Sequence, residues 1–88
     1  MKKIIEVDEK AGLDSLLGER VILLCMNYFY AGKLTSVNET FVLLEDASIV
    51  YETGEWGLPN WKDAQKIGRP VYVRIPTIEA VMPEQKSA

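Results

Sequence analysis

The segment Gly32–Leu44, GKLTSVNETFVLL, reads as a strand, a turn and a second strand. Asn38 and Glu39 separate two runs of β-branched and aliphatic residues, and Asn favours tight turns because its side chain bonds to nearby backbone. A second segment, Val73–Pro83 (VRIPTIEAVMP), has the same arrangement with Pro76 between its strands. Pro76 has no amide hydrogen to donate, so we expect a corner there. Together the two segments predict a small antiparallel β structure.

The rest of the chain supplies further short strands. Val21–Met26 is a continuous apolar run, which predicts a strand covered on both faces. Gly32 lies within the next strand and indicates a sharp bend or a close approach of backbone. The strand that begins at Thr40 is expected to continue to Tyr51 with a kink near Asp46. The five expected strands are 21–26, 29–37, 40–51, 71–74 and 77–82.

A short helix is expected before the first strand. Leu13, Leu16 and Leu17 have the spacing of one helical face, Asp8 is a candidate N-cap, and Gly18 is a candidate stop. Residues 1–8 form either a short strand or an N-terminal arm. The predicted fold class is therefore mainly β: a short N-terminal helix and a strongly bent five-stranded antiparallel barrel.

Residues 52–69 interrupt this pattern with glycines, a proline, Trp56 and Trp61. We expect a long inserted loop here, with a turn of helix between Trp61 and Ile67. The polar residues 84–88 are expected to form a flexible tail. The whole chain, residues 1–88, is predicted to be one domain because 88 residues are too few for two.

Composition argues against several classes of protein. The chain has a net charge of −3, no histidine and one cysteine, Cys25. This excludes an internal disulfide, argues against a structural zinc site or other cofactor, and gives the wrong sign for binding nucleic acid by bulk charge. No nucleophile lies beside a base, so an enzyme is not expected. Without a signal peptide or a membrane-spanning run, the protein is expected to be cytoplasmic.

Helix-first order and the two quoted segments favour one kind of small barrel over SH3-like and OB barrels. Together the segments resemble the bipartite motif of the Sm-like (LSm) proteins. In the first half, Gly32 and Leu34 match the motif, Asn38 replaces an aspartate, and Phe41-Val42 replaces a Met-Asn pair. In the second half, Val73 and Arg74 match and Ile75 replaces a glycine. These departures mark the chain as a divergent member.

The resemblance implies a nucleotide pocket, and the family's pocket residues correspond to Val42, Thr40 and Arg74. Valine has no side-chain group that reads a base edge, and threonine has no ring for stacking. Only Arg74 keeps its role, as a contact to phosphate or base, or else as an ion-pair partner of Glu45, Asp46 or Glu79. Asn38 is expected mainly to hold the turn. Trp56 and Trp61 either stack on bases or fix their loop to a barrel.

A lone barrel of this kind leaves two sheet edges without partners, which favours aggregation. Pairing the fourth strand of one copy with the fifth of the next removes both edges, and the resemblance implies a homo-oligomeric ring of about five to seven subunits. The residues expected at the subunit interface are Val71, Tyr72, Val73, Ile78, Ala80, Val81 and Met82. Two hypotheses follow: a ring that binds single-stranded RNA with a degenerate pocket, or a ring that serves as a scaffold for another protein.

Overall fold

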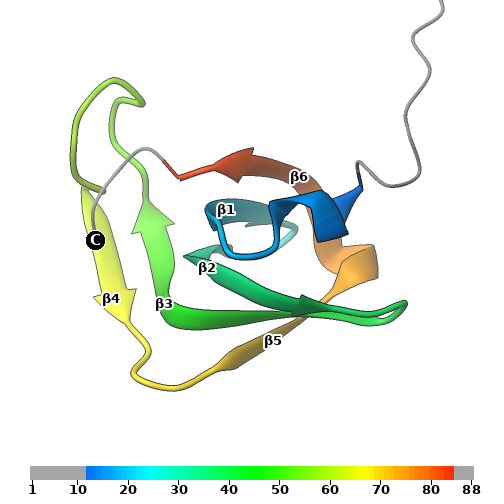
Figure 1. Ribbon diagram of the computed structural model, residues 1–88. Coiled ribbons are helices and arrows are strands. Elements are labelled where there is room, and N and C mark those ends of the chain that lie inside the picture. Colours follow the sequence, from blue (N-terminus) through cyan, green and yellow to red (C-terminus); the bar gives the residue numbers. More distant parts are fainter. Residues whose placement is uncertain (1–11, 85–88) are drawn as a thin grey trace, which may run out of the picture.

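The computed structural model describes residues 12–84, which form a small bent barrel of antiparallel strands (Figure 1). The strands are β1 (Arg20–Cys25), β2 (Phe29–Val37), β3 (Phe41–Glu52), β4 (Asp63–Lys66), β5 (Val71–Arg74) and β6 (Ile78–Pro83). Two 3-10 turns, η2 (Leu13–Leu16) and η3 (Ile75–Thr77), precede β1 and separate β5 from β6. The predicted mainly β fold is confirmed, and the predicted bounds of β2 and β5 match those observed.

Only one turn of helix, η2, lies in the described part of the N-terminal region. It ends near Gly18, whose φ of +87° is a backbone conformation that glycine adopts without strain. Gly18 is thus the predicted stop. The candidate cap Asp8 and the expected arm, residues 1–8, lie outside the described residues.

The sheet has the order β4-β3-β2-β1-β6. β5 also pairs with β3: it lies beside the first half of that strand, and β4 lies beside the second half. All five ladders are antiparallel. No ladder joins β5 to β6 among the described residues, so the barrel is open between them. Both strands therefore form edges of the sheet, as expected for a lone barrel of this kind.

Two residues bend the long strands. A Cβ atom on Gly32 would lie 3.1 Å from the Cα and Cβ of Ala47 and from the carbonyl oxygen of Glu45, so β2 and β3 approach each other where only glycine fits comfortably. In β3, Asp46 has a φ of 48°, which turns the strand at the predicted kink. These bends let a three-strand meander curl into a barrel.

The strands bury apolar side chains on both faces of the sheet. The interior cluster contains alternate residues of β1 together with Leu34, Val42 and Val73. A second cluster on the other face contains Ile22, Ala31, Val50 and Trp61. The apolar run of β1 is therefore covered on both sides, as its continuous hydrophobicity predicted. Burying each such aliphatic side chain contributes about 1.5–3 kcal/mol.

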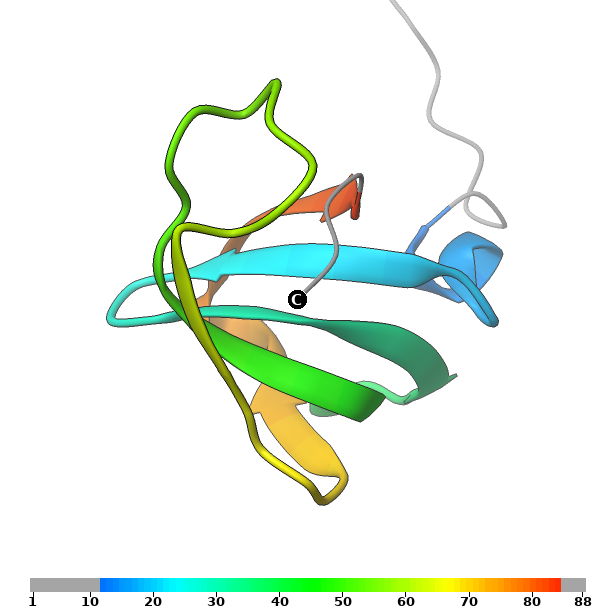
Figure 2. The same cartoon turned by 90° about the vertical axis from the view of Figure 1, so that its left-hand side faces the viewer.

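Residues 52–69 are more ordered than the sequence indicated. β4 lies inside this stretch and pairs Lys66 with Ser48 and Ala64 with Val50 on β3. The helical turn expected between Trp61 and Ile67 is therefore wrong. The remaining loop, residues 53–62, stands out from the sheet (Figure 2). Glu84, the first residue of the expected tail, has its side chain buried against the barrel, and residues 85–88 of that tail lie outside the described residues.

Candidate functional site

Two turns that are far apart in the sequence meet at one end of the barrel, at the right of Figure 1. The first joins β2 to β3, and the second is η3 between β5 and β6. The amide of Ile75 donates a 2.9 Å hydrogen bond to the carbonyl oxygen of Thr40, and Phe41 lies opposite Arg74 in the β3–β5 ladder. The two halves of the sequence motif therefore form one continuous surface, called here the paired-turn site.

Asn38 holds the first turn in shape. Its Oδ1 atom accepts hydrogen bonds of 2.7 Å from the amides of both Thr40 and Phe41. This is the turn role that the sequence predicted for Asn38, and it occupies the side-chain oxygen. Thr40 is left exposed at the tip, next to the backbone bond that joins the two turns.

Arg74 is exposed at the end of β5 and contributes the positive charge of the paired-turn site. The ion pairs found within residues 12–84 use Arg20 and Lys62 as cations, so Arg74 takes part in none of them. Of the acidic partners weighed for Arg74, Asp46 is bonded to Arg20 instead. Arg74 is thus an exposed cation outside the ion pairs of the described residues.

Val42, one of the expected pocket residues, does not reach the surface of the paired-turn site in a single chain. Its side chain is 0% exposed, packs in the interior cluster and lies opposite Val73 in the ladder. Val42 lies inside β3 with its side chain toward the interior, whereas Thr40, just before β3, is exposed. A threonine hydroxyl can donate and accept a hydrogen bond, which valine cannot.

An aromatic pair borders the paired-turn site, and the sequence reasoning missed it. Phe41 and Tyr72 pack edge to face with ring centroids 6.2 Å apart, and Tyr72 is 67% exposed. The alternation of β5 was the available signal: Val71 and Val73 face the interior, so Tyr72 and Arg74 must face outward together. Aromatic rings beside an arginine provide surfaces on which a base can stack.

Trp56 and Trp61 are not part of the paired-turn site. Their loop lies on the other side of the molecule from the two turns (Figure 1). Trp61 is only 7% exposed and belongs to the second cluster, while Trp56 is 49% exposed and packs edge to face on Trp61 at 5.7 Å. The sequence left open whether the tryptophans stack on bases or fix their loop to a barrel. Trp61 does the second, because it packs on the barrel of its own chain.

Both sheet edges present backbone groups that no strand of the same chain uses within residues 12–84. The amide of Ile75 donates a hydrogen bond to the carbonyl oxygen of Thr40. In an antiparallel ladder every second residue bonds to the partner strand, so the N–H and C=O groups of Tyr72 point away from β3. Beside β6, the amide of Glu84 donates a hydrogen bond to the carbonyl oxygen of Arg20. By the same alternation, the N–H and C=O groups of Val81 point away from β1. The side chains of the expected interface residues are mixed: Tyr72 and Ala80 are exposed, Val73 is buried, and Val71, Ile78, Val81 and Met82 are half-buried.

Burial raises the pKa of the Cys25 thiol, with a smaller raising effect from the negative charge of Glu79, while a hydrogen bond with Thr77 opposes the shift. Burial likewise raises the pKa of Tyr30. Neither group is therefore poised to ionise near neutral pH. Within residues 12–84, no three His, Cys, Asp or Glu side chains gather where they could hold a metal ion. No helix in that part of the chain is long and apolar enough to cross a membrane.

Comparison with known proteins identifies the fold. No protein-family model and no curated protein sequence matches the chain. Among solved structures it is similar to a heptameric archaeal Sm protein, with 22% sequence identity, a TM-score of 0.66, and coverage of 84% of this chain and 97% of that one. It is also similar to the P. aerophilum SmAP1 heptamer, with 21% identity, a TM-score of 0.69, and coverage of 91% and 97%. The protein described here therefore has the fold of the Sm proteins.

Proposed function

We propose that this protein assembles into a closed homo-oligomeric ring and that the ring binds single-stranded RNA at the paired-turn site. The observation that carries the proposal is the open barrel: β5 and β6 each present an unpaired edge among the described residues. A contact between edges of different kinds is head to tail, so it must close into a ring or grow into a filament. The solved neighbours, both described as heptamers, support closure.

RNA binding rests on the composition of the paired-turn site. Arg74 supplies a positive charge that is in no ion pair within residues 12–84, Thr40 supplies a hydroxyl group, and Phe41 with Tyr72 supplies aromatic surface. In a ring, each copy repeats these groups, so a strand of RNA meets several weak contacts at once. Recognition by stacking and a few local charges is compatible with a net charge of −3. No catalytic step is part of the proposal.

The test is fluorescence polarisation with labelled oligo-U, oligo-A and mixed-sequence RNA at low salt. Arg74→Gln is expected to weaken binding about tenfold or more, because a hydrogen bond to a charged group contributes ~1.5–3 kcal/mol. Arg69→Gln is the matched control, since Arg69 is also exposed but lies before β5 and outside the paired-turn site. Absence of binding to every RNA would contradict RNA binding, and equal losses for both variants would contradict binding at the paired-turn site.

A protein-binding scaffold is the second candidate. It is favoured by the acidic balance of 13 acidic against 10 basic residues and by the exposed Glu39 beside Thr40 in the first turn. Both features repel phosphate. A ring that captures a defined partner equally well before and after nuclease treatment, and that binds none of the RNAs, would support this candidate.

A further inference from the structure

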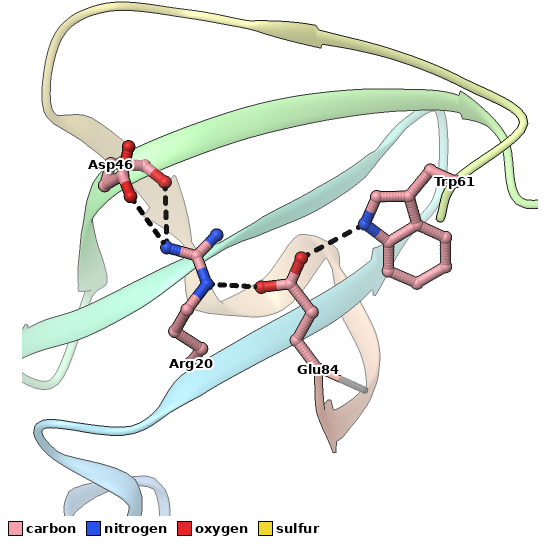
Figure 3. Close-up of polar contacts among 4 residues, drawn as sticks. All are labelled: Arg20, Asp46, Trp61 and Glu84. Atoms are coloured by element: carbon pink, nitrogen blue, oxygen red, sulfur yellow. Dashed lines mark hydrogen bonds and ion pairs between the residues drawn. The ribbon is translucent and has the colours of Figure 1, made fainter. Parts of the chain in front are cut away.

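Glu84 is a buried carboxylate with a partner on each oxygen (Figure 3). Its side chain is 1% exposed; Oε2 accepts a 2.7 Å hydrogen bond from Nε of Arg20, and Oε1 accepts a 3.1 Å bond from Nε1 of Trp61. Nη1 of Arg20 in turn reaches Oδ2 of Asp46 at 3.1 Å and its carbonyl oxygen at 3.2 Å. A buried charge is stable only when it is paired in this way, so the four residues depend on one another.

These contacts join four parts of the fold that the sequence keeps apart. Trp61 belongs to the loop before β4, Arg20 begins β1, Asp46 forms the kink of β3, and Glu84 directly follows β6. The backbone of Glu84 also takes part, because its amide donates a 3.0 Å hydrogen bond to the carbonyl of Arg20. One residue therefore both extends the β1–β6 ladder and holds the loop.

Apolar packing reinforces the same connection. The indole of Trp61 lies in the second cluster with Ile22 and Val50, and Met82 of β6 packs against that cluster. The loop thus covers the outer face of the sheet where the edge strand ends. Removing the indole from this position would expose Ile22, Val50 and one side of Met82 to water.

We propose that residues 53–62 act as a strap that keeps the end of β6 in place, with Glu84 as the group that fastens it. Without the carboxylate, the strap leaves the second cluster, and the last hydrogen bonds between β1 and β6 break. The β6 edge available to a neighbouring copy then becomes shorter. The effect on assembly rests on the proposed ring. The effect on the strap and on β6 concerns one chain and does not depend on it.

The test uses Glu84→Gln, which keeps the shape of the side chain and removes its charge. It is made in a Trp56→Phe background, so that Trp61 is the only tryptophan and its emission reports the strap. Glu52→Gln is the matched control, because Glu52 makes an exposed 3.6 Å pair with Lys62 beside the same loop. Trp61→Phe is a second variant: it keeps an aromatic ring in the cluster and lacks the N–H donor.

We expect Glu84→Gln to shift the emission of Trp61 to longer wavelength and to speed amide hydrogen exchange in β6 at least tenfold, with Glu52→Gln unchanged. Trp61→Phe is expected to speed the same exchange. Equal emission and exchange in Glu84→Gln and Glu52→Gln would overturn the strap. For assembly, Glu84→Gln is expected to raise the concentration at which the oligomer dissociates about tenfold. An oligomer equally stable in both variants would overturn the link to assembly, whereas a wild-type protein that is always a single chain would overturn the ring alone.

Discussion

At the scale of single residues, Gly32 decides whether β2 and β3 can cross closely enough to form a barrel. The atoms that an added Cβ would meet are backbone and short side-chain atoms of Glu45 and Ala47, which cannot rotate away. We therefore expect Gly32→Ala to lower the free energy of unfolding by about 1–3 kcal/mol, as overpacking does. Urea denaturation measures the change. Gly57→Ala is the control because nothing lies within 4 Å of its added Cβ, and equal stability of the two variants would contradict the argument.

Asn38 is expected to matter for the paired-turn site through its turn and not through direct contact. Asn38→Ala removes two hydrogen bonds to backbone amides and should lower the free energy of unfolding by about 0.5–2 kcal/mol, as the loss of similar capping bonds does. Asn38→Asp keeps the accepting oxygen and should remain close to wild type. The same denaturation experiment compares them, and a loss of equal size in both variants would show that the turn does not depend on that oxygen.

Cys25 contributes a dependence of stability on pH. Its pKa is raised in the folded state, so with rising pH the unfolded chain releases the thiol proton first. The stabilisation from this thiol is complete below the unfolded pKa and is lost as pH rises through the folded pKa. The free energy of unfolding of wild type should therefore fall more steeply at alkaline pH than that of Cys25→Ala. Parallel curves would contradict the assignment. The difference between the curves also includes the smaller raising effect of the Cys25 charge on the pKa of Tyr30, which Cys25→Ala removes.

At the scale of elements, β6 distinguishes backbone groups used within the chain from those free for a partner. The amide of Val81 points away from β1, whereas that of Met82 takes part in the β1–β6 ladder. Val81→Pro should therefore abolish assembly while the chain stays folded, and Met82→Pro should lower stability further by removing a rung. Light scattering and thermal unfolding check the pair. An oligomer that persists in Val81→Pro would contradict pairing through this edge.

Local sequence predicts the elements that carry their own signals. Some positions have backbone conformations or close contacts that few residue types allow. The structure bends at three of them: Gly32, Asp46 and Pro76. β4 carries no such signal: its sequence, Asp63 to Lys66, is polar and lacks alternation, and it is a strand because β3 offers it an edge. The Glu84–Trp61 bond joins residues 23 positions apart and was equally invisible. The burial of Val42 depends on which face of β3 packs against Val73, a contact 31 positions away in the sequence.

At the scale of the whole molecule, the chain combines a modest core with a barrel that is open between β5 and β6. A domain of 88 residues buries a modest core, and its loop adds a second apolar cluster on the outer face of the sheet. Within residues 12–84, β5 and β6 each keep an unpaired backbone edge, as does the short strand β4. Pairing β5 with β6 between copies satisfies both of their edges and places the paired-turn sites in a repeating arrangement.

The most direct measurement of this claim is the mass of the purified protein in solution, by light scattering coupled to gel filtration. The account predicts one sharp species of about five to seven times the 9.9 kDa chain, because the proposed head-to-tail pairing closes into a ring and does not grow into a filament. A species with the mass of a single chain at all concentrations would contradict pairing of the β5 and β6 edges, and with it the ring.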